Sequence, residues 1–333
     1  MIPRTALLLC LLVSPLARAN DSISEALPIL QSRYVDFAAL QAQPSDTLDN
    51  LVLRSNGEII VQAAAYTANP VTASAPVVLP EGVIYWRLDS FPAETAAVAA
   101  QLKSLVAGGA SGVILDLRSI STPNDFDGAA RVAGLFVRTG QPLFSLQPTG
   151  RSAHQYSGAG AIFAPGPIAV LINAGTAGAG EALAAALKAN GALTLGRSTA
   201  GAGAEFASQP LSGGEVLKYV DAQVTMADGT GLWRHAVQPD IGILTDPKKE
   251  RVVLNLIGQG KVLEVIRESA RSHRLSEATL VRGEDPSVEA YLVPTVKTVS
   301  VPQDATLVEA LDSLKAIRLS QGVTTGSAPA TVQ

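Results

Sequence analysis

Residues 166–201 read GPIAVLINAGTAGAGEALAAALKANGALTLGRSTAG. The apolar run at 167–175 predicts a buried strand, and the small residues at its end predict a tight corner. The alanine-rich run at 179–190 then predicts a helix, and 192–196 predicts a second strand. Strand, corner, helix and strand in this order are typical of one repeating unit of a parallel sheet.

The segments before this stretch continue the same alternation. Strands are predicted at 82–91 and 111–117, and helices at 92–109 and 127–138. Shorter strands follow, including EVLKYVDAQVTM at 215–226. The predicted fold class is therefore α/β, with a core of parallel strands whose crossover helices cover both faces of the sheet.

Composition shifts divide the chain into five predicted segments. They are a signal peptide (1–19), an N-terminal helical segment and linker (20–81), the core (82–241), a C-terminal α+β extension (242–319) and a disordered tail (320–333). Within the extension we expect a helix at 261–273 and a strand pair around 278–283 and 290–301. A last helix is predicted at 304–319.

The helix at 304–319 has a clear start and an apolar face. Asp304 precedes it as the expected N-cap. Leu307, Leu311 and Leu314 follow at helical spacing and predict the buried face.

The first residues have the pattern of a secretory signal peptide. Arg4 precedes the apolar run at 6–16, and Ala17-Arg18-Ala19 forms a small-x-small site, so we expect cleavage after Ala19 and a periplasmic or secreted protein. Cleavage would also remove Cys10, the only cysteine, and with it any disulfide or thiol chemistry.

The charge balance bears on possible partners. The formal net charge is −4, and loss of two signal-peptide arginines would make it −6. An acidic surface disfavours nucleic acid as a partner. No later run reaches the roughly 18 consecutive apolar residues of a membrane helix, so we expect no stable membrane insertion.

Four motifs in order resemble one enzyme family. They are YWRLDSF (85–91), GVILDLR (112–118), the stretch at 166–201, and DGTGLWRHAVQPDI (228–241). Over residues 82–241 they are similar to the C-terminal processing peptidases, also called tail-specific proteases. The resemblance implies a crotonase-like, ClpP-like core.

The same resemblance locates an altered catalytic machinery. The family uses a serine nucleophile and a lysine general base. Aligned on Glu181, its serine falls on Gly178, its lysine on Ala202, and the glutamine four residues after the lysine on Phe206. The Gly-Gly that helps to form the family's oxyanion hole is absent from DLRSISTPNDFDGAA at 116–130.

The resemblance therefore implies a catalytically inactive homologue that binds a polypeptide or partner protein, or serves as a scaffold, in the cell envelope. The residues expected to line its cleft are Gly175, Thr176, Ala177, Gly178, Ala179, Gly201, Ala202 and Gly203. Two alternatives stay open. One is an active serine-type peptidase with a non-standard nucleophile, for which Thr176, Ser198 and Ser208 are candidates. The other is a structural subunit that accompanies a catalytic relative.

Several residues have a structural and a functional interpretation. For Thr176 we favour a hydroxyl that caps the following helix over a substitute nucleophile. Glu181 is expected to have a structural role near the helix start, where the helix dipole favours a carboxylate. Trp86 and Trp233 are expected in the core or at its rim, and His235 on the surface.

The remaining candidates are weaker. His154, expected in a loop, could form a triad with Ser152 or Ser157. NDFDG at 124–128 hints at a calcium loop, but the twelfth position is Gly134 rather than a carboxylate. The glycine-rich stretches have neither P-loop nor Rossmann spacing, so we expect no metal and no cofactor.

Overall fold

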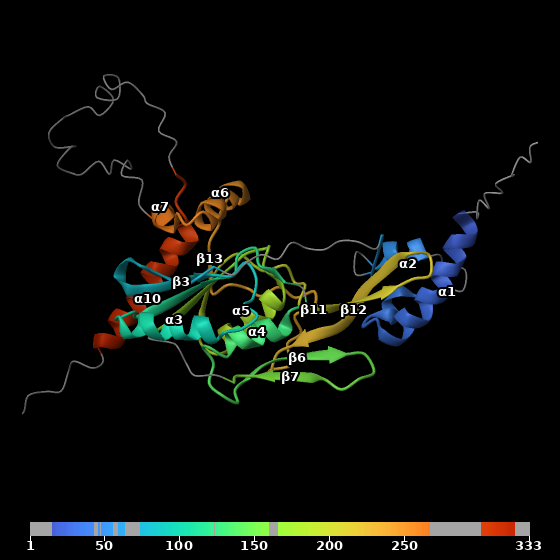
Figure 1. The fold of residues 1–333 in the computed structure, drawn as a ribbon, viewed down its shortest axis with the longest axis horizontal. Coiled ribbons are helices and arrows are strands. Elements are labelled where there is room, and N and C mark those ends of the chain that lie inside the picture. The colour runs from blue at the N-terminus through green and yellow to red at the C-terminus, as the bar shows by residue number, and fades with distance from the viewer. Residues whose placement is uncertain are drawn as a thin grey trace, which may run out of the picture.

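The computed structural model describes residues 15–42, 46, 48–55, 59–63, 74–122, 124–159, 166–266 and 301–323. Figure 1 shows the core with the C-terminal helices at one end and the N-terminal helices at the other. The mixed α/β class predicted from the sequence is confirmed. In the described part of the chain, no helix is long and apolar enough to cross a membrane.

A six-stranded sheet forms the centre of the core. Its order is β13-β10-β8-β4-β3-β2, and all neighbours are parallel except β2 and β3. The strands are β2 (Val77–Leu79), β3 (Val83–Arg87), β4 (Gly112–Asp116), β8 (Ile168–Ile172), β10 (Leu193–Gly196) and β13 (Ile241–Gly242). β3, β4 and β8 are near-continuous apolar runs, as expected of parallel strands buried on both faces.

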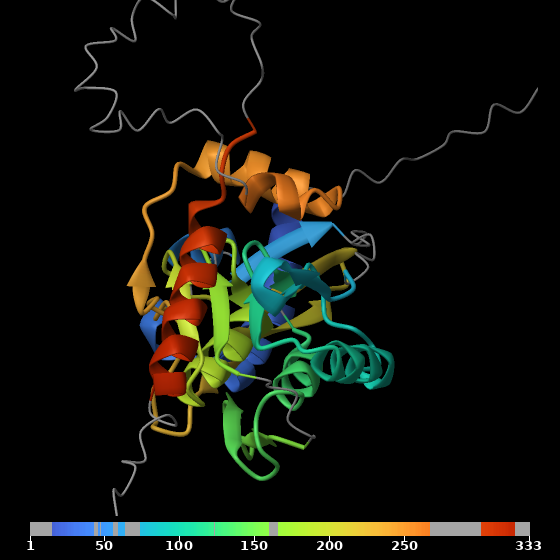
Figure 2. The same cartoon turned by 90° about the vertical axis from the view of Figure 1, so that its left-hand side faces the viewer.

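Successive residues of these strands face two separate apolar clusters. Ile84 and Trp86 pack with the helices on one face, whereas Val83 and Tyr85 pack with those on the other. The first face carries α3 (Ala96–Ala107), α4 (Phe126–Ala133) and α5 (Ala179–Ala189). The second carries α6 (Pro247–Gly258), α7 (Val262–Ile266) and α10 (Ala305–Val323), and Figure 2 shows α10 lying across it.

A second, antiparallel sheet extends from the core toward the N-terminal helices (Figure 1). Its order is β1-β12-β6-β7, with β11 on the other side of β12. The strands are β1 (Ile59–Ala63), β6 (Pro142–Pro148), β7 (His154–Ser157), β11 (Ala204–Pro210) and β12 (Glu215–Thr225). A third cluster packs this sheet against α1 (Pro15–Arg33), the 3-10 turn η1 (Phe37–Leu40) and α2 (Leu48–Arg54).

Four sequence predictions need correction. Residues 77–79, expected in a linker, form β2, and His154, expected in a loop, begins β7. The helix expected to reach Arg138 ends at Ala133, and residues 320–323, expected in the tail, complete α10. Strand pairing explains the first two, because β2 and β7 are stabilised by β3 and β6 and have little pattern of their own.

The end of α10 extends past its predicted apolar face, and Ser320 and Gln321 there are exposed. Several expectations lie wholly or mostly outside the described residues: the first part of the signal peptide, the helix beyond residue 266, the strand pair at 278–301 and the tail after residue 323.

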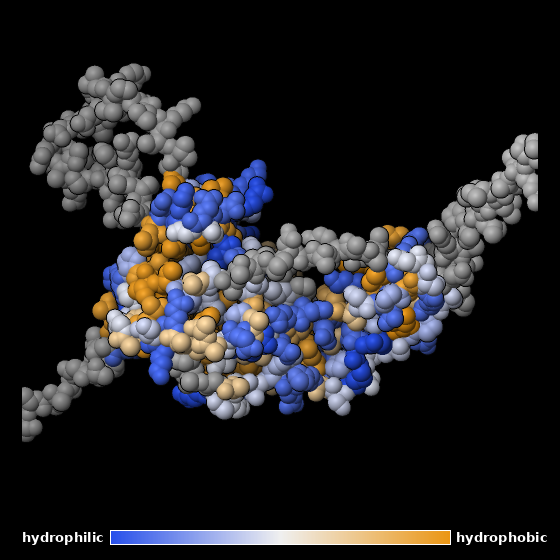
Figure 3. All heavy atoms as spheres, viewed as in Figure 1, coloured by the Kyte–Doolittle hydropathy of each residue, from blue (hydrophilic) through white to orange (hydrophobic). Residues whose placement is uncertain are grey.

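Exposed apolar residues gather where β2, α7 and α10 meet (Figure 3). Val77, Val78 and Leu263 are each more than two-fifths exposed there. Pro76 and Pro80 flank β2, and a proline cannot donate a backbone hydrogen bond. The free edge of this sheet is therefore short and poorly suited to further strand pairing.

Candidate functional site

The corner predicted from the sequence joins β8 to α5. After β8 the chain turns through Asn173–Thr176, forms the two-residue strand β9 (Ala177–Gly178) and enters α5 at Ala179. Gly178 has φ 58° and ψ −124°, a backbone conformation that glycine adopts far more readily than other residues. Local backbone geometry thus explains why glycine is well tolerated at the helix start.

Thr176 does not cap α5, which corrects the sequence prediction. The Thr176 hydroxyl is completely buried and donates to the Leu117 carbonyl at 2.8 Å. It also accepts from the Asn173 backbone N–H at 3.1 Å. The hydroxyl ties the corner to the end of β4, and its burial and hydrogen bonds disfavour Thr176 as a nucleophile.

Glu181 holds the corner against the loop that follows β10. Its carboxylate is fully buried and accepts backbone hydrogen bonds from Gly178 at 3.2 Å, Gly201 at 2.7 Å and Ala202 at 2.6 Å. The Thr199 hydroxyl donates to the same carboxylate. Burial raises the pKa of Glu181 above its ordinary value, and these hydrogen bonds offset part of that rise. The structural role predicted for Glu181 is present, with contacts beyond its own helix.

The residues after β4 run beside the corner. β5 (Ser121–Thr122) pairs in parallel with β9, and the Ala177 N–H donates to the Ile120 carbonyl at 3.1 Å. Ser119 has φ 65°, and its N–H donates to the Asn173 side chain at 3.0 Å. In this chain the segment aligned with the family's Gly-Gly is hydrogen-bonded to the corner as a short strand.

Ala202 and Phe206 lie next to Trp233. Ala202 forms an antiparallel bridge with Trp233, and the Phe206 and Trp233 rings meet edge to face with centroids 6.0 Å apart. Of the predicted cleft residues, the structure thus brings the Gly178 corner and the loop at 201–202 together through Glu181. A pocket of about 590 Å³ lies beside the C-terminal half of α5, and none of the eight predicted cleft residues lines it.

The alternative nucleophiles have no base within hydrogen-bonding distance in the described part of the chain. Ser198 donates to the Gln238 side chain at 2.6 Å, and Ser208 is exposed on β11 opposite Lys218. His154 contacts the Tyr156 ring, with centroids 4.5 Å apart, rather than Ser152 or Ser157. Ser157 also lies three residues after His154 on β7, so the two side chains face opposite sides.

The other predicted positions are as follows. Trp86 is fully buried in the core, Trp233 is partly buried beside the third cluster, and His235 is exposed. Among the described residues, no group of three or more His, Cys, Asp or Glu side chains could hold a metal ion. The absence of a metal and of a cofactor stays a prediction.

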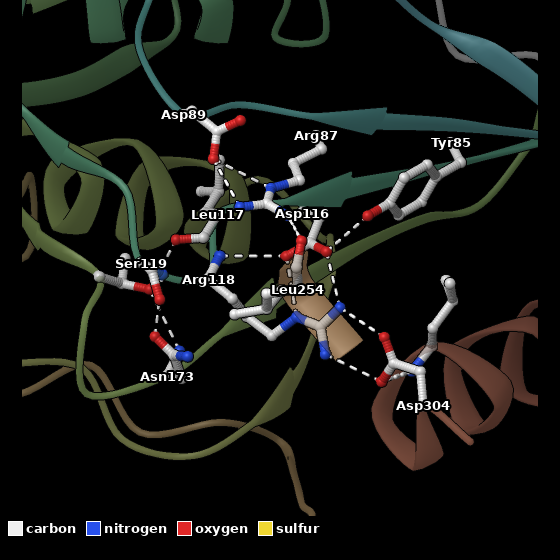
Figure 4. Close-up of polar contacts among 12 residues, drawn as sticks. Tyr85, Arg87, Asp89, Asp116, Leu117, Arg118, Ser119, Asn173, Leu254 and Asp304 are labelled. Atoms are coloured by element: carbon white, nitrogen blue, oxygen red, sulfur yellow. Dashed lines mark hydrogen bonds and ion pairs between the residues drawn. The ribbon is translucent and has the colours of Figure 1, made fainter. Parts of the chain in front are cut away.

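Sequence reasoning missed a buried ionic network at the end of β4 (Figure 4). Arg118 donates to both oxygens of Asp116, at 2.9 and 2.7 Å, and to both oxygens of Asp304, at 2.9 and 2.7 Å. The Tyr85 hydroxyl also donates to Asp116 at 2.7 Å. All three charged side chains are at most 3% exposed. The only local signal was an Asp at the end of an apolar strand and an Arg two residues later.

Mutual attraction keeps Asp116 and Arg118 ionised. Burial alone would raise the pKa of Asp116, but Arg118 and Tyr85 hold it below its ordinary value. Burial would likewise lower the pKa of Arg118, yet the two carboxylates raise it well above the usual range. Asp304 also accepts from the Leu307 N–H at 3.1 Å, which confirms it as the N-cap of α10.

Comparison with known proteins agrees with the order of motifs. Residues 82–243 match the model of peptidase family S41. Over those residues, slightly under half of the chain, it is similar to members of that family. The resemblance to C-terminal processing peptidases is confirmed at this level, and the match includes β3, β4, the corner and β12.

Two relatives are chloroplast enzymes. A C-terminal processing peptidase of Tetradesmus obliquus is 30% identical over 194 residues, which cover 55% of this chain and 41% of the relative. Carboxyl-terminal-processing peptidase 2 of Arabidopsis thaliana is 28% identical over 216 residues, which cover 62% of this chain and 42% of the relative. The chain thus spans less than half the length of either relative.

A solved structure supports the fold alone. It is a protein from Parabacteroides merdae described as a candidate peptidase, with a TM-score of 0.52 and 14% identity. The likeness covers 72% of this chain and 96% of that protein.

Proposed function

We propose that this chain is a non-catalytic S41 homologue that binds polypeptide in the cell envelope. The proposal rests on Gly178. This residue has no side chain, and its backbone N–H donates to the Glu181 carboxylate. On the family alignment this residue stands in place of the nucleophile. A backbone N–H already bonded to a carboxylate is also poorly placed to stabilise an oxyanion.

The neighbouring positions support the same proposal. The side chain of Ala202 has no basic group, and that of Phe206 has no amide. The Thr176 hydroxyl is buried and donates to the Leu117 carbonyl. Loss of reactive groups with retention of the corner, its helix and the adjoining loop is consistent with a binding role. The relatives named as processing peptidases suggest polypeptide as the class of ligand.

Export is the second part of the proposal. Cleavage after Ala19 would leave a helix from residue 20 to Arg33 that still contains the fully buried Ala26 and Leu30. Docking of α1 against the antiparallel sheet is therefore compatible with loss of the signal peptide. N-terminal sequencing of the chain from an envelope fraction should begin at Asn20, and an intact Met1 there would contradict export by this route.

Labelled casein tests binding and cleavage in one sample. We expect the full chain to raise the fluorescence anisotropy of casein without producing fragments. Cleavage that is lost on Ser198→Ala or Ser208→Ala, with a fluorophosphonate probe labelling that serine, would establish the active-peptidase alternative instead. Absence of both binding and cleavage would reject both functions for this unfolded substrate.

The double variant Gly178→Ser/Ala202→Lys tests the alignment. Serine in this sparsely populated backbone conformation costs on the order of 1–3 kcal/mol, so the variant must first be shown to fold. Casein cleavage by this variant alone would support an intact cleft that lacks only its reactive groups.

A further inference from the structure

The outer edge of β11 has an unusual partner. Among the strands that the structure describes, β11 pairs only with β12, along one of its two edges. On the other side, the Phe206 N–H donates to the Asn124 side-chain oxygen at 2.9 Å, and the Asn124 amide nitrogen donates to the Phe206 carbonyl at 2.5 Å. The backbone groups of Phe206 therefore point away from β12.

Strand alternation places the backbone groups of Ser208 on the same outer edge, and Pro210 ends the strand there without an N–H. Ser208 and Pro210 are both exposed.

Asn124 satisfies Phe206 in the way that a neighbouring strand would. In an antiparallel ladder, one residue exchanges both an N–H and a C=O with the residue opposite. A side-chain amide carries the same donor and acceptor as a peptide group. Asn124 thus occupies, from an exposed position before α4, the place that a residue of an added strand would take.

The face of β11 beside this edge is aromatic and positive. The Lys218 ammonium lies 5.1 Å from the centroid of the Phe206 ring, and Ser208 is directly opposite Lys218. Among the described residues, no carboxylate lies within ion-pair distance of Lys218. An acidic side chain on a strand added next to Ser208 would lie on the same face as this ammonium.

We propose that the outer edge of β11 accepts an extended, acidic polypeptide segment as an added strand, and that Asn124 occupies this position until the segment displaces it. The proposal rests on the proposed function and names both the mode of binding and the surface. Strand addition at a free sheet edge is a common way to bind extended peptides, with backbone hydrogen bonds giving affinity. A second copy of this chain would bring another Lys218, rather than an acidic side chain, toward this face.

Two substitutions should change the affinity for an added strand in opposite directions. Labelled β-casein serves as the acidic, unfolded probe. Ser208→Pro removes the outward N–H and should weaken binding about tenfold, whereas the matched control Ser208→Ala keeps the N–H and should bind like the wild type. Asn124→Ala removes the competing amide and should tighten binding severalfold. Circular dichroism and melting temperature verify folding of each variant.

The outcomes separate this inference from the proposed function. If the wild type binds β-casein and Ser208→Pro binds as tightly as Ser208→Ala, the edge proposal is overturned while the binding function stands. If neither the wild type nor Asn124→Ala binds, both are overturned. Binding by Asn124→Ala alone supports the edge proposal, because Asn124 would then block the site completely. Dimerisation of Asn124→Ala without casein binding would assign the edge to a second copy instead.

Discussion

Two buried carboxylate sites in this molecule are stabilised by different means. At the end of β4, Asp116 and Asp304 share the guanidinium of Arg118, so opposite charges balance one another in the interior. At the corner before α5, Glu181 is equally buried, but its donors among the described residues are three backbone N–H groups and the Thr199 hydroxyl, all of them neutral.

The difference appears in the pKa values. Ion pairing lowers the pKa of Asp116, whereas burial raises that of Glu181. The Arg118 site joins elements that are distant in sequence, β4 and the start of α10. The Glu181 site fixes the positions of two backbone segments around the predicted cleft. Removal of Arg118 should therefore leave unpaired charge, and removal of Glu181 should leave unpaired donors.

The largest effect is expected for Arg118→Met. This change leaves two buried carboxylates without their cation, and breaking a buried ion pair in this way typically costs about 3–5 kcal/mol. Equilibrium urea unfolding should show that loss in the free energy of unfolding.

The matched control is Arg131→Met. Arg131 lies 3.9 Å from Asp125 in an exposed pair, and its removal should change stability by less than about 1 kcal/mol. Equal effects of the two substitutions would mean that the Arg118 network contributes no more than a surface pair.

Glu181→Leu should have a smaller but still large effect. It leaves the backbone N–H groups of Gly178, Gly201 and Ala202 without an acceptor, and an unsatisfied buried donor costs about 1–3 kcal/mol. Relaxation of the loop would recover part of this loss, so we expect a total of about 2–4 kcal/mol in urea unfolding.

Two comparisons sharpen this prediction. Glu181→Gln keeps one acceptor oxygen and should lose less stability than Glu181→Leu. Glu94→Leu, at an exposed position, should change stability by about 0.5 kcal/mol or less. A Glu181→Leu protein as stable as Glu94→Leu would show that the hydrogen bonds to Glu181 do not hold the corner.

These two sites also show what the sequence can predict. Asp304 as N-cap and the apolar face with Leu307 and Leu314 were predicted, because capping and helical periodicity act within a few residues. The pairing of Arg118 with Asp304 spans 186 residues, and no local pattern encodes it.

At the corner between β8 and α5, too, the sequence predicts the local structure but not the contacts with distant segments. Its strand, turn and helix follow from local apolar and small-residue patterns, and Glu181 was expected near the helix start. The bond from Thr176 to Leu117 depends on a neighbouring strand 59 residues away, so local reasoning assigned that hydroxyl to the helix instead. Contacts of Glu181 with Gly201 and Ala202 depend in the same way on the return of the chain after β10.

The smallest predicted effect is the dependence of the free energy of unfolding on pH. Its sign differs between the Glu181 site and the Arg118 site. Because burial raises the pKa of Glu181, the folded state holds that proton more tightly than the unfolded chain does. The stabilising contribution of Glu181 is therefore fully present below its ordinary pKa of 4.5 and is lost as the pH rises through the raised value. For Asp116 the contribution is present above its ordinary pKa of 3.8 and is lost as the pH falls through the lowered value.

Urea unfolding of the wild type and Glu181→Gln at several pH values above 4.5 measures this difference. The stability advantage of the wild type over Glu181→Gln should shrink as the pH rises, because only the wild type loses the favourable proton. Asp116→Asn serves as the comparison, since over the same range Asp116 stays ionised and its advantage should remain constant. An advantage over Glu181→Gln that grows with pH would mean that the four donors outweigh burial and lower the pKa of Glu181. The corner would then resemble the Arg118 site in its electrostatics, although its donors carry no charge.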